Sequence, residues 1–174
     1  MKQVVVYFHG YGSSATSDKV KQLQSLFDDV YAWDIDIDPR KSLPELEQHI
    51  DKVLTDYAVR NVEVNVWFVG TSLGANYASR FGDMYDVNTL LINPSYVPSV
   101  SLAKYGVDEC IRNEYDDTVI NKNDYVVLAK DDEVIDHTGR DFSNAAVVVY
   151  NDKGGHRFNG PEFLQTVEAV CFPQ

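Results

Sequence analysis

The stretch that decides the expected fold is Val64-Asn65-Val66-Trp67-Phe68-Val69-Gly70-Thr71-Ser72-Leu73-Gly74-Ala75. Its first six residues are mostly β-branched or aromatic and predict a buried strand, whereas residues 75–81 suit a helix. Between them lies the pattern Gly-x-Ser-x-Gly, which in this setting indicates a serine held on a sharp strand-to-helix turn. The turn places the Ser72 hydroxyl beside the free N–H of Leu73, where a developing oxyanion would be stabilised.

Length and composition limit the classes of protein that this chain can belong to. Its 174 residues suffice for one domain with its own core, so we expect a single domain over residues 1–174. A net charge of −12 argues against nucleic acid and anionic membranes as partners, because both would be repelled. No apolar run approaches membrane-spanning length, and Met1 to Phe8 is too short for a signal-peptide core. We therefore expect a cytoplasmic protein, with self-association into a homodimer left open.

The two cysteines do not indicate a disulfide or a metal site. Cys110 and Cys171 lie in unlike contexts and have no CxxC or Cys/His ligand spacing. Free thiols in a reducing compartment are therefore expected.

Strands and helices are expected to alternate along the chain. Strands are predicted at residues 3–8, 30–37, 64–69, 89–93, 125–129 and 145–150. Helices are predicted at residues 17–27, 42–58 (opened by Ser42-Leu43-Pro44-Glu45), 75–81, near Leu102, from 136 to 142, and at 161–170. This alternation predicts an α/β fold with a mostly parallel sheet of about six strands and helices on both faces. The irregular segment 94–123 has room for a small cover over a site, but not for a large cap domain.

Three aspartates alternate along the second predicted strand. Asp34, Asp36 and Asp38 lack the glycine turn and the distal glutamate of a calcium loop. We therefore favour an edge strand with one solvated face over a metal site.

Several polar residues directly follow predicted strands. In parallel α/β sheets, ligands bind outside the carboxyl ends of the strands. The segment His9-Gly10-Tyr11, Ser72, the pair Asp131-Asp132 and His156 should therefore meet at one edge of the sheet.

A serine hydroxyl needs a base to take its proton and an acid to orient that base. In folds that hold the serine on such a strand-to-helix turn, the three residues follow one another along the chain as serine, acid, histidine. His156 is the preferred base because it lies in a glycine-rich loop between the last strand and the last helix. His9 is expected to shape the first loop, and His49 and His137 are expected to be surface or packing residues.

The acid is expected in the run Asp131-Asp132-Glu133-Val134-Ile135-Asp136, directly after a strand. We prefer Asp132, because Val134 and Ile135 can anchor the loop beneath it. Asp131 is the main competitor and Asp136 the second. A run of acids is most often solvated surface, but its place at a strand end favours a role in the site.

An oxyanion hole requires two N–H donors. Leu73 is expected to supply one. The other is expected from Tyr11, where the backbone of the first loop can turn back toward Ser72. Gly10 and Gly12 are also compatible with a simple tight turn, and both interpretations can hold together.

A resemblance to a known family rests on motifs spread over nearly the whole chain: Tyr7-Phe8-His9-Gly10 with Ser13-Ser14, Lys19-Val20 before Gln22-Leu23-Gln24, Gly70-Thr71-Ser72-Leu73-Gly74, Asn93-Pro94 with Pro98, Asp132-Glu133, and Gly155-His156 before Phe158. Together they resemble the α/β-hydrolase superfamily, and within it the small esterase-like proteins of the YqiA/YcfP type. The small size, the Asn-Pro strand end and the Asp-Glu loop carry this narrower match.

The resemblance implies a hydrolase without a cap domain, with Ser72 as nucleophile, Asp132 as acid and His156 as base. Some relatives lack the elbow serine, whereas this chain retains it, which favours an active enzyme. Ala75 stands where members often have a glycine, and we expect a residue this small to be tolerated.

The expected function is cleavage of small carboxylic esters with short acyl chains through an acyl-enzyme. No metal and no organic cofactor is expected, and the expected partner is a small-molecule ester. The alternatives are a hydrolase-fold binding or scaffold protein with little or no activity, and a thioesterase. A dehalogenase is disfavoured, because that chemistry needs an aspartate in place of Ser72.

Overall fold

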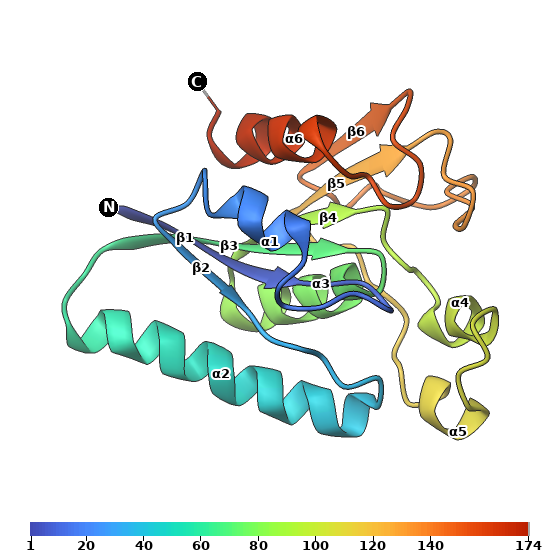
Figure 1. Cartoon of the computed structure of the whole chain (residues 1–174), viewed down its shortest axis with the longest axis horizontal. Coiled ribbons are helices and arrows are strands. Elements are labelled where there is room, and N and C mark those ends of the chain that lie inside the picture. Colours follow the sequence, from blue (N-terminus) through green and yellow to red (C-terminus); the bar gives the residue numbers. More distant parts are fainter. Residues whose placement is uncertain (174) are drawn as a thin grey trace.

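A central sheet of six strands, in which every neighbouring pair is parallel, organises the protein (Figure 1). The computed structural model describes residues 1–173. The strands are β1 (Lys2–Phe8), β2 (Asp29–Ala32), β3 (Val64–Thr71), β4 (Asn88–Ile92), β5 (Asp124–Ala129) and β6 (Val147–Asn151). Their order in the sheet is β2-β1-β3-β4-β5-β6. The predicted parallel α/β sheet is confirmed.

Helices cover both faces of this sheet (Figure 1). They are α1 (Asp18–Leu23), α2 (Pro39–Val59), α3 (Leu73–Tyr85), α4 (Pro98–Ala103), α5 (Glu109–Arg112) and α6 (Pro161–Cys171). Alternate residues of β1 separate the two layers: Val6 and Phe8 pack with α2 and α3, whereas Val5 and Tyr7 pack with α1 and α6. Because β1 is buried on both faces, its sequence is a continuous apolar run without alternation.

The segment after β4 passes beyond the carboxyl ends of the strands (Figure 1). The helix predicted near Leu102 is present as α4, and the short helix α5 follows it without having been predicted. Both lie at the edge of the sheet where the functional residues were expected.

The second strand and the second helix differ from their predicted limits. β2 is indeed at the edge of the sheet but ends at Ala32, because the backbone N–H of Ile35 donates to His9 Nε2 instead of continuing the ladder. α2 begins at Pro39 and is capped by Asp38, whose side chain accepts from the N–H of Arg40. The prediction that Ser42-Leu43-Pro44-Glu45 opens this helix was therefore wrong.

The predicted helix from 136 to 142 was wrong as well. Residues 130–146 contain no helix or strand. Short acidic side chains there accept hydrogen bonds from N–H groups two residues further on, as Asp136 does from Thr138 and Asp141 from Ser143. These local bonds compete with a helical ladder and hold the segment as a series of turns.

The carboxylates of the aspartate trio serve local structure. Asp34 accepts from the N–H of Ala15, and Asp36 accepts from the N–H of Asp38. Among residues 1–173 no group of three or more His, Cys, Asp or Glu side chains is arranged to hold a metal ion.

Cys110 is exposed and Cys171 is buried, and both are free thiols, as predicted.

None of the helices within residues 1–173 combines the length and the apolar character needed to cross a membrane.

Candidate active site

The turn between β3 and α3 holds Ser72 in a conformation that few side-chain-bearing residues adopt. Its φ is 54° and its ψ is −118°, a region that costs about 1–3 kcal/mol for a residue other than glycine. The flanking glycines are required by space. A Cβ at Gly70 would lie 2.4 Å from the carbonyl oxygen of Gly74, and a Cβ at Gly74 would lie 2.0 Å from that of Phe8.

Backbone hydrogen bonds fix the serine against the next strand. The N–H of Ser72 donates to the carbonyl of Ile92 at 3.0 Å, and the N–H of Ser95 donates to the carbonyl of Ser72 at 3.1 Å. The strained residue is therefore tied to the end of β4 and to the loop that follows it.

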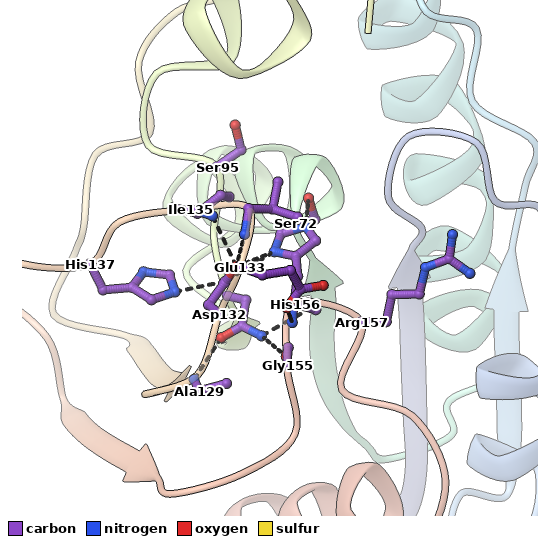
Figure 2. A network of polar contacts seen from close by, with 12 residues as sticks. Ser72, Ser95, Ala129, Asp132, Glu133, Ile135, His137, Gly155, His156 and Arg157 are labelled. Atoms are coloured by element: carbon purple, nitrogen blue, oxygen red, sulfur yellow. Dashed lines mark hydrogen bonds and ion pairs between the residues drawn. The ribbon is translucent and has the colours of Figure 1, made fainter. Parts of the chain in front are cut away.

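A continuous chain of hydrogen bonds joins Ser72, His156 and Asp132 (Figure 2). His156 Nε2 lies 2.8 Å from Ser72 Oγ, and His156 Nδ1 lies 3.0 Å from Asp132 Oδ2. Because the ionised Asp132 can only accept, Nδ1 carries the proton and donates to it, so Nε2 carries the lone pair and accepts from the serine hydroxyl. The structure thus brings together the three residues that the sequence nominated as nucleophile, base and acid.

The carboxylate of Asp132 is buried and fully hydrogen-bonded. Its side chain is 1% exposed, and its Oδ1 accepts from the N–H groups of Val134 and Ile135 at 2.8 and 2.9 Å. Burial alone would raise the pKa of Asp132, but hydrogen bonds from His137, His156 and these two N–H groups hold it well below its usual value. The Asp132 carboxylate is therefore ionised at neutral pH.

A second imidazole lies on the far side of this carboxylate (Figure 2). His137 Nε2 is 2.9 Å from Asp132 Oδ2, and His137 Nδ1 is 2.7 Å from the hydroxyl of buried Tyr96. Because the Asp132 carboxylate can only accept, Nε2–H of His137 donates to it, and in the neutral imidazole Nδ1 then accepts from the Tyr96 hydroxyl, whose pKa is raised by burial. His137 was expected to be a surface or packing residue: it is not at the surface, and it both packs edge-to-face on Tyr96 and contacts Asp132. Its place depends on the turns of residues 130–146, which carry no periodic pattern.

The neighbours of Asp132 hold the histidine loop. Asp131 accepts from the N–H groups of Gly154 and Gly155 at 3.3 and 2.9 Å, and Glu133 Oε2 accepts from the N–H of His156 at 2.9 Å. Of the interactions that lower the pKa of Glu133, this hydrogen bond from His156 is the largest. Asp131 thus contacts the loop backbone rather than the imidazole.

The second competitor for the acid role, Asp136, lies apart from the imidazole. Its carboxylate accepts from the N–H and the hydroxyl of Thr138. Of the three candidates, Asp132 is the one in contact with His156.

Asn93 joins the ends of two strands to the same loop. Its side-chain N–H₂ donates to the carbonyls of Gly155 and His156 at 3.0 Å each, and its Oδ1 accepts from the N–H of Ala129 at 2.8 Å. The residue is fully buried with a φ of 45°. The sequence marks it as the polar end of a buried strand before a proline, a signal that indicates a special position without showing its partners.

The donors expected for an oxyanion hole lie beside the serine. A Cβ on Gly10 would lie 3.3 Å from that of Ser72 and 3.9 Å from its Oγ, so the first loop passes close to Ser72. Within residues 1–173 the backbone N–H groups of Tyr11 and Leu73 donate to no protein acceptor. Both remain available to a ligand oxygen.

A cavity of about 440 Å³ opens at Ser72. Tyr11, Tyr105 and His156 line it, and the rings of Tyr11 and Tyr105 are 5.1 Å apart. Because Tyr105 follows α4, the segment after β4 does form a small cover at the edge of the site.

The other two histidines lie where the sequence suggested. His9 Nδ1 donates to the carbonyl of Gly10 and its Nε2 accepts from Ile35, so it shapes the first loop. His49 stacks on Trp33 with ring centroids 4.9 Å apart.

Relatives in sequence match nearly the full length of the chain. The profile described as "Uncharacterised protein family (UPF0227)" matches residues 4–170. A UPF0227 protein of Vibrio campbellii is 26% identical, with 89% of this chain and 91% of the relative covered. The UPF0227 protein YcfP of Escherichia coli O9:H4 is 24% identical over 95% of this chain and 97% of its own length.

Solved structures show the same fold at low sequence identity. The mouse alpha/beta hydrolase domain-containing protein 10 superposes with a TM-score of 0.74 at 12% identity, covering 97% of this chain and 87% of that one. An esterase from Pyrococcus furiosus gives a TM-score of 0.67 at 16% identity, covering 99% and 77%. The chain therefore belongs to the UPF0227 family, which includes YcfP, and has the fold of the α/β hydrolases.

Proposed function

We propose that this protein is a serine hydrolase that cleaves small carboxylic esters through an acyl-enzyme. The observation that carries the proposal is the hydrogen-bond chain from Ser72 Oγ through His156 to the buried carboxylate of Asp132. A neutral imidazole held in this tautomer is the base that a serine hydroxyl needs before it can attack a carbonyl carbon.

In the first half of the reaction, Ser72 Oγ attacks the ester carbonyl while His156 Nε2 accepts its proton. The developing oxyanion receives hydrogen bonds from the N–H groups of Tyr11 and Leu73, each worth roughly 3–4 kcal/mol in such sites. His156 then gives the proton to the leaving alcohol, and the acyl group stays on Ser72. Asp132 keeps the Nδ1 proton in place and stabilises the imidazolium that forms.

In the second half, water replaces the alcohol. His156 takes a proton from the water as its oxygen attacks the acyl carbon, and returns it to Ser72 Oγ as the carboxylic acid leaves. Within residues 1–173 no large cap domain covers the cavity at Ser72, which favours small substrates. Thioesters follow the same steps, so they belong in the substrate panel.

The test is turnover of p-nitrophenyl butyrate by the purified protein and by Ser72→Ala. We expect release of p-nitrophenolate by the wild type, and a rate near the uncatalysed background with Ser72→Ala. Ser25→Ala, which changes an exposed serine outside the cavity lining, is the matched control and should keep the wild-type rate. Equal rates for the wild type and Ser72→Ala would contradict the proposal and favour a binding or scaffold role for the fold.

A further inference from the structure

Two basic side chains line the cavity at Ser72, although the chain as a whole carries a net charge of −12. Lys19 comes from α1 and Arg157 directly follows His156. Asp18 is the sole carboxylate among the lining residues, and it faces outward: its side chain is 93% exposed, with Oδ1 3.3 Å from Lys21 Nζ. The wall of the cavity is therefore locally positive.

These two cations retain unused hydrogen-bond donors. Lys19 Nζ donates to the carbonyl of Arg157 at 2.7 Å and to Asn159 Oδ1 at 2.5 Å, which leaves one of its three N–H groups. Figure 2 shows the Arg157 side chain extending away from Asp132 and His137, without a dashed line from its guanidinium to any residue drawn. Among residues 1–173 neither cation has a carboxylate within ion-pair distance.

The repulsion between the positive charges of Lys19 and Arg157 indicates that the cavity is suited to bind an anion. Burial and the nearby charge of Arg157 lower the pKa of Lys19 to about 8. Lys19 is half-buried and Arg157 is exposed, and the repulsion between these two like charges on one cavity wall is relieved by an anion placed between them. Arginine adds a planar fork that matches the two oxygens of a carboxylate.

We propose that the cavity selects esters that carry a second, negatively charged group, such as a carboxylate. Lys19 and Arg157 bind this group while Ser72 reacts with the ester carbonyl. The inference rests on the proposed function for the reaction itself. It adds the substrate class, which the hydrogen-bond chain of Ser72, His156 and Asp132 does not determine.

Lys19 also has a purely structural contact, because its two bonds join α1 to the loop that carries His156. A substitution there could lower turnover of every ester by displacing the base. The decisive quantity is therefore the ratio of kcat/KM for a charged ester to that for its neutral partner, since damage to the base affects both equally.

Two matched ester pairs place the charge on either half of the substrate. In the first pair, mono-p-nitrophenyl adipate has a carboxylate on its acyl half, and its methyl ester is the neutral partner. In the second pair, 4-acetoxybenzoate has a carboxylate on its alcohol half, and its methyl ester is the neutral partner. We expect the charged member of at least one pair to have a kcat/KM about tenfold above its partner. The net charge alone predicts the opposite order, because it repels anions. Charged members equal to or slower than their partners in both pairs would overturn the proposal.

Variants assign the preference to the two cations. Arg157→Gln should lower the ratio about tenfold, and Arg157→Lys should keep part of the preference. Lys21→Gln is the matched control on α1, because Lys21 is exposed and outside the cavity lining. A ratio that is unchanged in both Arg157→Gln and Lys19→Gln would contradict the assignment.

A binding measurement separates this inference from the proposed function. Calorimetric titration of Ser72→Ala with monomethyl adipate and with dimethyl adipate requires no turnover. We expect the monoanion to bind at least about tenfold more tightly, and Arg157→Gln in the same background to remove the difference. If Ser72→Ala binds the monoanion preferentially but the wild type turns over no ester, the proposed reaction is overturned and the anion site is supported. Equal affinities would overturn the anion site even if esters are hydrolysed.

Discussion

Asp132 is the residue in which most contacts of the site converge. Its two oxygens accept from two imidazoles and two backbone N–H groups, and its side chain is almost fully buried. Asp131, one position earlier, contacts only the backbone of the histidine loop. The two adjacent acids should therefore respond differently to the same substitution.

Asp132→Asn should lower kcat by about 10³–10⁴-fold, because an amide cannot hold the Nδ1 proton of His156 and stabilise the imidazolium. Asp131→Asn keeps one oxygen acceptor for the loop and should cost less than about tenfold. Steady-state kinetics with p-nitrophenyl butyrate, with circular dichroism to verify folding, distinguish the two. If Asp131→Asn has the larger effect, the triad acid is wrongly assigned.

The lowered pKa of Asp132 also predicts a pH dependence of stability. A carboxylate whose pKa is lower in the folded than in the unfolded chain stabilises the fold above the ordinary pKa of about 4, and this contribution is lost as pH falls toward the folded pKa. Urea unfolding of the wild type and Asp132→Asn at pH 5 and pH 3 measures it. The difference in unfolding free energy, wild type minus variant, should shrink by about 1 kcal/mol at the lower pH. A difference that grows at pH 3 would contradict the sign of the shift.

His137 is predicted to act as a positioning residue for Asp132. Glutamine can replace both of its contacts, with the amide N–H₂ donating to the carboxylate and the amide oxygen accepting from Tyr96, whereas phenylalanine replaces neither. We expect His137→Phe to lower kcat about tenfold with little change in KM, and His137→Gln to recover most of the loss. A purely packing role would give the opposite order, since phenylalanine fills the space of the ring better.

At the scale of elements, the turn between β3 and α3 depends on close packing against β1. Gly74→Ala would place a Cβ against the carbonyl of Phe8 at the end of β1 and should cost at least about 3 kcal/mol in unfolding free energy. Gly12 is the matched control: it has a φ of +72° but nothing within 4 Å of an added Cβ, so Gly12→Ala should cost about 1–2 kcal/mol from backbone strain alone. Chemical denaturation of both variants tests this. Equal losses would show that the turn is not limited by space.

The elements that the sequence predicted correctly are those with continuous apolar patterns. β1, β3 and α3 are buried, and their types follow from residue order alone. The predicted helix at 136–142 was wrong because side chains such as Asp136 and Asp141 satisfy nearby N–H groups in turns, and no periodic pattern records such bonds.

The same limit applies to the polar contacts of the site. Ser72, Asp132 and His156 could be nominated because each directly follows a strand, and a parallel sheet brings such ends together. The contacts of His137 and Asn93 depend on how irregular loops fold over one another. Their residue types alone therefore do not predict them.

At the scale of the whole molecule, the parallel sheet brings together the residues of the candidate site from segments far apart in the sequence. Tyr11 follows β1, Ser72 follows β3, Asp132 follows β5 and His156 follows β6. Because the site exists only when these strands are in register, loss of the fold and loss of activity should coincide. Activity is therefore a stringent probe of the arrangement.

The most direct test of the central claim is the reaction of Ser72 with a fluorophosphonate, followed by mass spectrometry of the labelled peptide. The arrangement predicts one label on Ser72 in the wild type, none at that position in Ser72→Ala, and labelling of Ser72 in His156→Ala that is slower by orders of magnitude. Folded wild-type protein that stays unlabelled at Ser72, or that labels at the same rate without His156, would contradict it.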